Sequence, residues 1–420
     1  MIGGDKLVID ALLDSRQSDD RLLFKNDGSQ KTFPMISIIS LLLKVAITND
    51  PYSMHAGFKS GIIFNACICL FVFFVTNISF HLFVKTWLYS TSYSYSLIWK
   101  LCYGAKTIII PSLMIIFAYY SISSLCTVQF YESFSSFSKI AFKTDFSLSA
   151  SKYVITIVIS LVTVIPFILK ESMFDLLLIS NISNFLLIYS CSFVGYHFVV
   201  KVFRDGFDPT HKLVYWNPDH KAFLSSFGLF NTAFFIHPFI SVFSQRLENA
   251  TESRVKKLVW LTTLITGLLN FLTGFCGYVL FNDFSKETII EYFPASNMFI
   301  DLAKIGMAVS NVFGNTAFSY YLAFQQCDLI YEKSVKSIPS RIISGVIVIA
   351  FNTFISSMPE STVSYFGLLG DICFVFLAFV FPSTFYLRVS GFKNMTMGIV
   401  AILIIIILVP ISVFQIKEEF

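Results

Sequence analysis

The chain has 420 residues, of which 55% are hydrophobic and only 13% are charged, and its mean hydropathy is +0.72. A soluble domain is normally about a quarter charged, so this much apolar surface cannot be hidden in a water-soluble core. The net charge of +4 is small and comes from loops, so it gives no reason to expect a nucleic-acid partner. The composition therefore predicts an integral membrane protein that has the lipid bilayer as its main solvent.

The eight cysteines lie almost entirely within apolar runs and form no Cys-x-x-Cys pair. Cys67 and Cys69 are two residues apart, which points their thiols to different sides of a helix. A disulfide framework or a zinc site therefore does not fit the pattern, and we expect neither a metal nor a cofactor.

Residues 1–32 carry six Asp against five Lys or Arg and contain no apolar core followed by a small-residue cleavage site. This pattern differs from a signal peptide. We expect a cytosolic N-terminal tail, followed by a transmembrane domain over residues 33–415.

Membrane spans are visible as gaps between charges, because a charge at the bilayer centre costs about 2.5–3.5 kcal/mol on insertion scales. Nine uncharged segments are long enough for a membrane-crossing helix. They are 60–84, 107–131, 153–169, 176–200, 222–245, 258–282, 305–327, 342–359 and 394–416. Two further apolar segments, 33–58 and 362–387, contain charges, so the expected total is eleven transmembrane helices.

The spans do not alternate apolar and polar residues as the strands of a membrane β-barrel do, so the predicted class is all-α. With the N-terminus in the cytosol, 17 loop Lys and Arg lie inside and 10 outside, which favours this orientation. Among cellular membranes we favour the plasma membrane over the vacuolar or lysosomal membrane.

Two spans contain a polar residue directly before a proline. The first reads LLLKVAITNDPYSMHAG over 41–57, with Lys44 in its middle and Asp50 before Pro51. The span 222–245 carries Asn231 and the pair His237-Pro238. Proline removes a backbone donor and disfavours helix at the preceding residue, so we predict two discontinuous helices. A simple kink is the alternative for each proline taken alone.

The two breaks fall at corresponding places in two halves of the chain. Residues 33–200 and 222–390 would each hold five spans, with 394–416 as an extra helix. An odd number of spans per repeat gives the halves opposite topology. Unwound backbone is tolerated in a membrane only inside protein or along a water-filled cavity, so the breaks are expected to face each other around a central site.

Three places in the chain carry a family resemblance. The stretch 234–281 contains the His-Pro pair, a short basic loop, and a Gly-x-x-Gly-Tyr formed by Gly274, Gly277 and Tyr278. The stretch 366–389 has a glycine, an apolar run, then Pro and Tyr-Leu-Arg. The third is Pro51-Tyr52 followed by Gly57. In this order, the three resemble the amino acid/auxin permease family.

The resemblance implies a leucine-transporter-type fold of five-plus-five inverted repeats. It also implies amino acid transport by alternating access, coupled to protons or sodium, with the substrate held at the unwound parts of the two broken helices. The expected substrate-binding residues are Val45, Ala46, Ile47, Thr48, Asn231, Phe234, Phe235 and Asn311.

Residues expected in ion coupling or gating are Lys44, Asp50, His237, Asp371 and Asn315, and the helix-breaking residues are Pro51 and Pro238. Asn311 and Asn315 lie one turn apart and are expected to line a cavity. Asp371 is the only acid deep within its span and needs a partner, for which Lys44 is our candidate.

The chain departs from the resembled family at two positions. Lys44-Val45-Ala46 occupies the place of the usual Gly-x-Gly before the proline, and Phe239 replaces the acidic residue that often follows His-Pro. The Lys44 ammonium would repel Na⁺ and could take its place, so we predict sodium-independent transport and leave proton coupling open.

Other functions remain to be compared with transport. The chain has no Gly-x-x-x-x-Gly-Lys-Ser/Thr motif, which argues against an ATP-driven pump. A transporter-like nutrient receptor, which binds an amino acid without net transport, is the alternative function. A membrane enzyme is disfavoured because the six histidines are scattered without a repeated motif. We expect a monomer.

Overall fold

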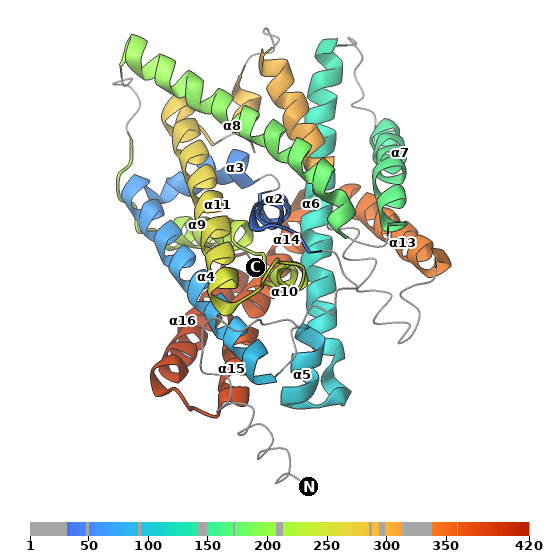
Figure 1. The fold of residues 1–420 in the computed structure, drawn as a ribbon. Coiled ribbons are helices and arrows are strands. Elements are labelled where there is room, and N and C mark those ends of the chain that lie inside the picture. The colour runs from blue at the N-terminus through green and yellow to red at the C-terminus, as the bar shows by residue number, and fades with distance from the viewer. Residues whose placement is uncertain are drawn as a thin grey trace.

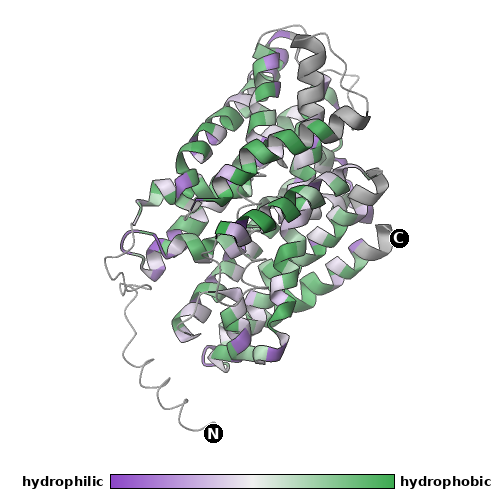
Figure 2. Ribbon diagram, turned by 90° about the vertical axis from the view of Figure 1, so that its right-hand side faces the viewer, coloured by the Kyte–Doolittle hydropathy of each residue, from purple (hydrophilic) through white to green (hydrophobic). Residues whose placement is uncertain are grey.

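The computed structural model describes residues 32–47, 50–90, 94–141, 149–170, 173–206, 213–284, 288–293, 299–312, 314, 338–358 and 360–419. Within these ranges the regular elements are helices, and an isolated β-bridge joins Phe33 and Leu247. Eight helices of this described part are long and apolar enough to cross a membrane. Figure 2 shows hydrophobic residues along most of the helices and hydrophilic ones gathered near their ends.

The multi-pass, all-helical class predicted from the sequence is therefore confirmed. The total of eleven spans stays a prediction, since the segment 305–327 extends into residues outside the described ranges. The elements of the first half are α2 (Met35–Ala46), α3 (Asp50–Ser53), η1 (Met54–Ser60), α4 (Ile62–Ser90), α5 (Tyr95–Tyr103), η2 (Ala105–Thr107), α6 (Ile109–Ala141), α7 (Ser149–Ile168), η3 (Met173–Leu176) and α8 (Leu177–Asp205).

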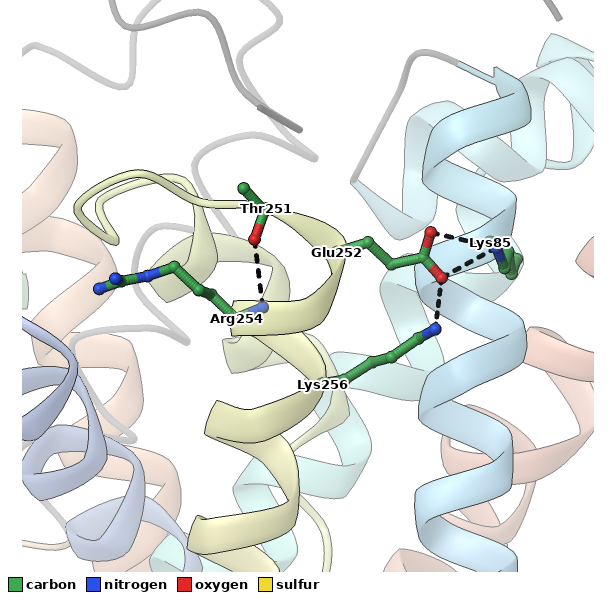
Figure 3. Close-up of polar contacts among 5 residues, drawn as sticks. All are labelled: Lys85, Thr251, Glu252, Arg254 and Lys256. Carbon is green, nitrogen blue, oxygen red and sulfur yellow. Dashed lines mark hydrogen bonds and ion pairs between the residues drawn. The ribbon is translucent and has the colours of Figure 1, made fainter. Parts of the chain in front are cut away.

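The second half contains α9 (His220–Ala233), α10 (His237–Ser244), α11 (Glu252–Phe281), η4 (Ile289–Tyr292), a helix over 299–312, α13 (Ile338–Ser356), α14 (Glu360–Val375), the π-helical turn η5 (Phe376–Val380), α15 (Phe381–Ser390) and α16 (Met395–Glu419). Three of these helices begin with a side-chain cap, among them α16, where the Asn394 side chain accepts the Met397 N–H at 3.2 Å. The Asp219 carboxylate accepts the Ala222 N–H of α9 at 3.1 Å. The Thr251 hydroxyl accepts the Arg254 N–H of α11 at 3.3 Å (Figure 3). Such caps satisfy backbone donors that the first helical turn leaves free.

The helices differ in how far the rest of the protein covers them. In the most apolar window of each span, 83% of the α9–α10 segment is buried but only 28% of α16. α9–α10 is therefore a central element and α16 faces the lipid with most of its surface. Figure 1 shows α2 and α10 next to each other in the middle of the molecule, with α7 and α13 at one side and α15 and α16 at the lower edge.

Polar side chains also join helices away from the centre. The Asn352 amide of α13 donates to Ser123 Oγ at 2.6 Å, and Ser124 Oγ donates to Asn352 Oδ1 at 3.1 Å. These bonds link α13 to α6 inside the bundle. Small polar residues commonly hold membrane helices together in this way.

Close approach of η1 to α11 depends on a glycine. A Cβ atom added at Gly274 would lie 2.7 Å from Met54 Cβ and 3.0 Å from the Met54 carbonyl carbon. Backbone cannot move away as a flexible side-chain end can, so any larger residue at Gly274 must separate the two elements.

We expect Gly274→Ala to destabilise the protein by about 1–3 kcal/mol through this overpacking. Thermal unfolding of the purified protein in detergent measures the effect. Gly195→Ala in α8 is the matched control, because a Cβ there meets nothing within 4 Å and alanine favours the helix. Equal melting temperatures for the two variants would contradict the packing argument.

Candidate functional site

Both spans with a central proline are interrupted in the structure. α2 ends at Ala46, and α3 begins at Asp50 with Pro51 as its second residue. α9 ends at Ala233, and α10 begins at His237 with Pro238 in its first turn. A proline in the first helical turn needs no backbone donor, which explains why each new helical segment can begin there.

Contacts on both sides of the breaks place the two interruptions at the same height in the helix bundle. α2 packs against α10, and η1 packs against α9. Before α2, the Phe33 N–H donates to the Arg246 carbonyl oxygen at 2.8 Å, just after α10. At the other end, Ser226 Oγ of α9 donates to the Gly57 carbonyl oxygen of η1 at 2.7 Å. The broken helices therefore run antiparallel, with their breaks side by side.

The predicted substrate residues surround these breaks and are closed off from solvent. Their exposed fractions are 5% for Val45, 3% for Ala46, 1% for Ile47, 1% for Asn231, 1% for Phe234, 2% for Phe235 and 0% for Asn311. Thr48 and Asn315 lie outside the described residues. The predicted substrate residues that the structure describes are thus all buried inside the helix bundle.

Lys44 is buried near the end of α2, with 1% of its surface exposed. Its Nζ donates to Ser310 Oγ at 2.8 Å, and Ser183 Oγ of α8 donates to the same oxygen at 3.3 Å. An ammonium group near a helix C-terminus is favoured by the partial negative charge of the last carbonyls. The three residues join α2, α8 and the 299–312 helix around one positive charge.

The predicted pairing of Lys44 with Asp371 is wrong. The Asp371 carboxylate accepts the Thr232 hydroxyl at 2.9 Å, and the structure gives Lys44 no ion pair within the described residues. The reason is their position along the bundle. Lys44 belongs to the half that packs with α10, whereas Asp371 on α14 faces α9, beyond the break.

Two amides at the centre keep polar atoms without hydrogen bonds. Among the described residues, neither Nδ2 nor Oδ1 of Asn311 has a partner, and Oδ1 of Asn231 has none either. The Asn231 amide donates to the Asp371 carbonyl oxygen at 3.5 Å. An unpaired polar group in a protein interior costs about 1–3 kcal/mol, so these atoms are available for a bound solute.

His237 and Asp50 are the remaining predicted coupling residues. The His237 ring is fully buried and stacks on Phe80, with ring centres 3.8 Å apart and planes at 6°. Among the described residues neither ring nitrogen of His237 has a hydrogen-bond partner, so its role in coupling stays a prediction. Asp50 begins α3.

A cavity of about 390 Å³ opens beside the break, between α6, α9 and α14. Its wall includes Thr232 and Asp371, with Lys221 and Gln129 further along. Phe374 also lines it, and the Phe374 ring centre lies 4.5 Å from that of Phe235. Phe235 precedes α10, so this aromatic pair connects the cavity wall to the break in the second interrupted helix.

Several of these residues were not found by sequence reasoning. Thr232 and Gln129 line the cavity, and Ser183 supports the Lys44 contact. Thr232 follows Asn231 directly and could have been included from that position. Ser183 has no distinguishing signal, because Ser is common in packed membrane helices.

The buried charge gives a test of this geometry. We expect Ser310→Ala to destabilise the protein by about 1.5–3 kcal/mol, because it removes the acceptor of a buried ammonium. Lys44→Met is expected to raise the melting temperature, because it removes a buried charge that lacks an acidic partner in the described structure.

Thermal unfolding in detergent measures both variants. Ser412→Ala is the control for Ser310→Ala, since Ser412 is 2% exposed and its hydroxyl donates only within its own helix, to the Leu408 carbonyl at 3.2 Å. A Lys44→Met protein that melts below the parent would contradict the assignment.

The fold and the site together define a polytopic helical membrane protein with two interrupted helices crossing at its centre. The family model described as "Transmembrane amino acid transporter protein" matches residues 51–416, so the chain belongs to this family. The family resemblance expected from the sequence is thereby confirmed.

One curated relative is the "Putative sodium-coupled neutral amino acid transporter 11" of Bos taurus. It is 20% identical over 368 residues, which cover 87% of this chain and 78% of that protein. Two solved structures are similar in fold. MhsT in complex with L-phenylalanine has a TM-score of 0.55 at 12% identity, covering 93% of this chain and 100% of that chain. Mhp1, a nucleobase-cation-symport-1 family transporter in a closed conformation with bromovinylhydantoin bound, has a TM-score of 0.59 at 10% identity, covering 93% and 95%. The fold is thus shared with leucine-transporter-type transporters.

Proposed function

We propose that the protein is a secondary active transporter that carries a neutral amino acid across its membrane by alternating access, without requiring sodium. The observation that carries the proposal is the pair of interrupted helices side by side, with the buried, unpaired Asn231 Oδ1 near the end of α9. Membership of an amino acid transporter family supports the substrate class. The name of the bovine relative supports a neutral substrate.

The substrate's two charged groups would be held at the breaks. The α10 N-terminus presents the positive end of a helix dipole, which suits a carboxylate, although the Phe239 and Ile240 N–H groups already donate to the Ile236 carbonyl. The carbonyls of Leu43, Phe230 and Thr232 are already hydrogen-bonded, so an ammonium group would be held by other carbonyls at the ends of α2 and α9. The aromatic rings of Phe234 and Phe235 would surround an uncharged side chain.

Lys44 supports the absence of a sodium requirement. Its ammonium already satisfies the Ser310 oxygen at 2.8 Å, in a buried position between three helices. A cation entering the same place would meet a fixed positive charge in a medium of low dielectric constant. The bovine relative is named as sodium-coupled, so this chain would differ from it in the driving ion. A proton gradient is the alternative source of energy.

Alternating access would use the cavity beside the break. A solute that enters it would reach the Phe235–Phe374 pair and would pass to the centre when these rings separate. The two halves 33–200 and 222–390, each beginning with an interrupted helix, would be the inverted repeats that move against each other.

Uptake into liposomes tests the transport proposal. Reconstituted full-length protein should accumulate a labelled neutral amino acid equally well in NaCl and in choline chloride, since Lys44 replaces the cation. Lys44→Ala should reduce uptake at least about tenfold, an effect worth 1.4 kcal/mol or more. The control is Lys100→Ala on the exposed surface of α5.

Two results would contradict the proposal, and a third would identify the driving ion. Uptake that collapses in choline chloride refutes sodium independence. Binding of the amino acid without uptake under any ion gradient supports the receptor alternative. Stimulation by an inward pH gradient identifies the proton as the coupling ion.

The unpaired amides give a second test. Asn311→Leu should weaken amino acid binding about 3- to 10-fold by removing one hydrogen bond, while it leaves unfolding stability unchanged or higher. Binding of a labelled amino acid and thermal unfolding measure the two effects.

Asn77→Leu is the matched control. The Asn77 amide donates to the Phe73 carbonyl at 2.9 Å and to Thr263 Oγ1 at 3.1 Å, so its replacement should lower stability and leave binding unchanged. If Asn311→Leu unfolds as readily as Asn77→Leu, the Asn311 amide is structural rather than substrate-binding.

A further inference from the structure

A second hollow lies on the lipid-facing surface, away from the breaks. It measures about 270 Å³ and runs between α4, α11 and α16. Its lining includes Phe74, Phe80, Lys256, Trp260 and Val400. Phe74 is 50% exposed and Trp260 45% exposed, so the groove is open to the surroundings. In a membrane-spanning region these surroundings are acyl chains.

One end of this groove is positively charged. The Glu252 carboxylate lies 2.9 Å from Lys85 Nζ of α4 and 2.6 Å from Lys256 Nζ of α11 (Figure 3). One carboxylate balances only one of the two ammonium groups, which leaves one net positive charge at the groove. The Lys85 and Lys256 side chains are 30% and 33% exposed, against 7% for Glu252. An anion can therefore approach the ammonium groups from outside.

We propose that this groove binds an anionic phospholipid, with one acyl chain along α4 and α11 and the phosphate at Lys256 and Lys85. An apolar groove open to lipid favours a hydrocarbon chain, and the uncompensated ammonium group selects a negative headgroup over a zwitterionic one. The predicted cytosolic position of both lysines agrees, since anionic lipids are enriched in the cytoplasmic leaflet.

The groove is connected to the helix break through one ring. Phe80 lines the groove, and the same ring stacks on His237 at a centre-to-centre distance of 3.8 Å. His237 is the first residue of α10. A chain in the groove would therefore support the ring on which the start of α10 rests. This consequence for transport rests on the proposed function, whereas the binding of lipid does not.

Tryptophan quenching tests the binding. The full-length protein is reconstituted in vesicles with bromine atoms on the acyl chains of either phosphatidylglycerol or phosphatidylcholine, at equal mole fraction. Trp260→Phe identifies the part of the fluorescence that comes from the groove. Brominated phosphatidylglycerol should quench the Trp260 signal more strongly, with an apparent affinity about fivefold higher for the one extra positive charge.

Two variants distinguish the contribution of the lipid headgroup to binding from that of the acyl chain. Lys256→Gln should remove the preference for phosphatidylglycerol, and it leaves Glu252 paired with Lys85, so the fold is preserved. Val400→Phe should narrow the groove and weaken quenching by both lipids. Lys100→Gln, on an exposed surface of α5 that does not line the groove, is the charge-matched control and should behave as the parent.

Equal quenching by the two lipids would overturn the proposal, as would an equal loss of preference in Lys256→Gln and Lys100→Gln. Full competition by soluble glycerol phosphate would overturn it too, because a free anion would then suffice without a chain. Tryptophan quenching reports lipid binding without any transport. Its result can therefore be interpreted even if the proposed transport function is wrong.

Discussion

The architecture depends on one constraint: inside a bilayer, every backbone N–H and C=O must find a partner within the protein or at a water-filled surface. An interrupted helix exposes such groups and can exist only at the centre of the bundle. The α9–α10 segment is the most deeply buried of the eight described candidate spans, and α2 packs against it. The surrounding helices bury the two breaks, and turn-like bonds such as Phe235 N–H to the Thr232 carbonyl satisfy part of the backbone there.

A buried positive charge is the second determinant of this site. Lys44 Nζ donates to Ser310 Oγ, Ser183 Oγ donates to that same oxygen, and no acid pairs with Lys44 among the described residues. Its burial costs free energy, which the hydrogen bond to Ser310 and the carbonyls at the end of α2 offset only in part. The same charge accounts for the proposed sodium independence and ties α2 to α8 and to the 299–312 helix.

The lipid-facing groove connects the break at the start of α10 with the membrane. Lys85 and Lys256 join α4 to α11 through Glu252, and the Phe80 ring carries the contact inward to His237. The pair α4 and α11 thus forms the groove, and through Phe80 it also contacts the start of α10 at the break. A change in the lipid at the surface and a change in the backbone at the centre would act on the same ring stack.

The sequence by itself determined the membrane class, the family and the positions of both breaks, because each depends on local chemistry. Charge gaps mark spans through the cost of burying a charge, and Pro51 and Pro238 act on their own backbone. The cavity wall and the partners of Lys44 were decided only by tertiary structure. Ser310 is 266 residues away in sequence from Lys44, and Thr232 is 139 from Asp371. Which distant side chains meet depends on how helices pack, and no residue pattern along one helix contains that information.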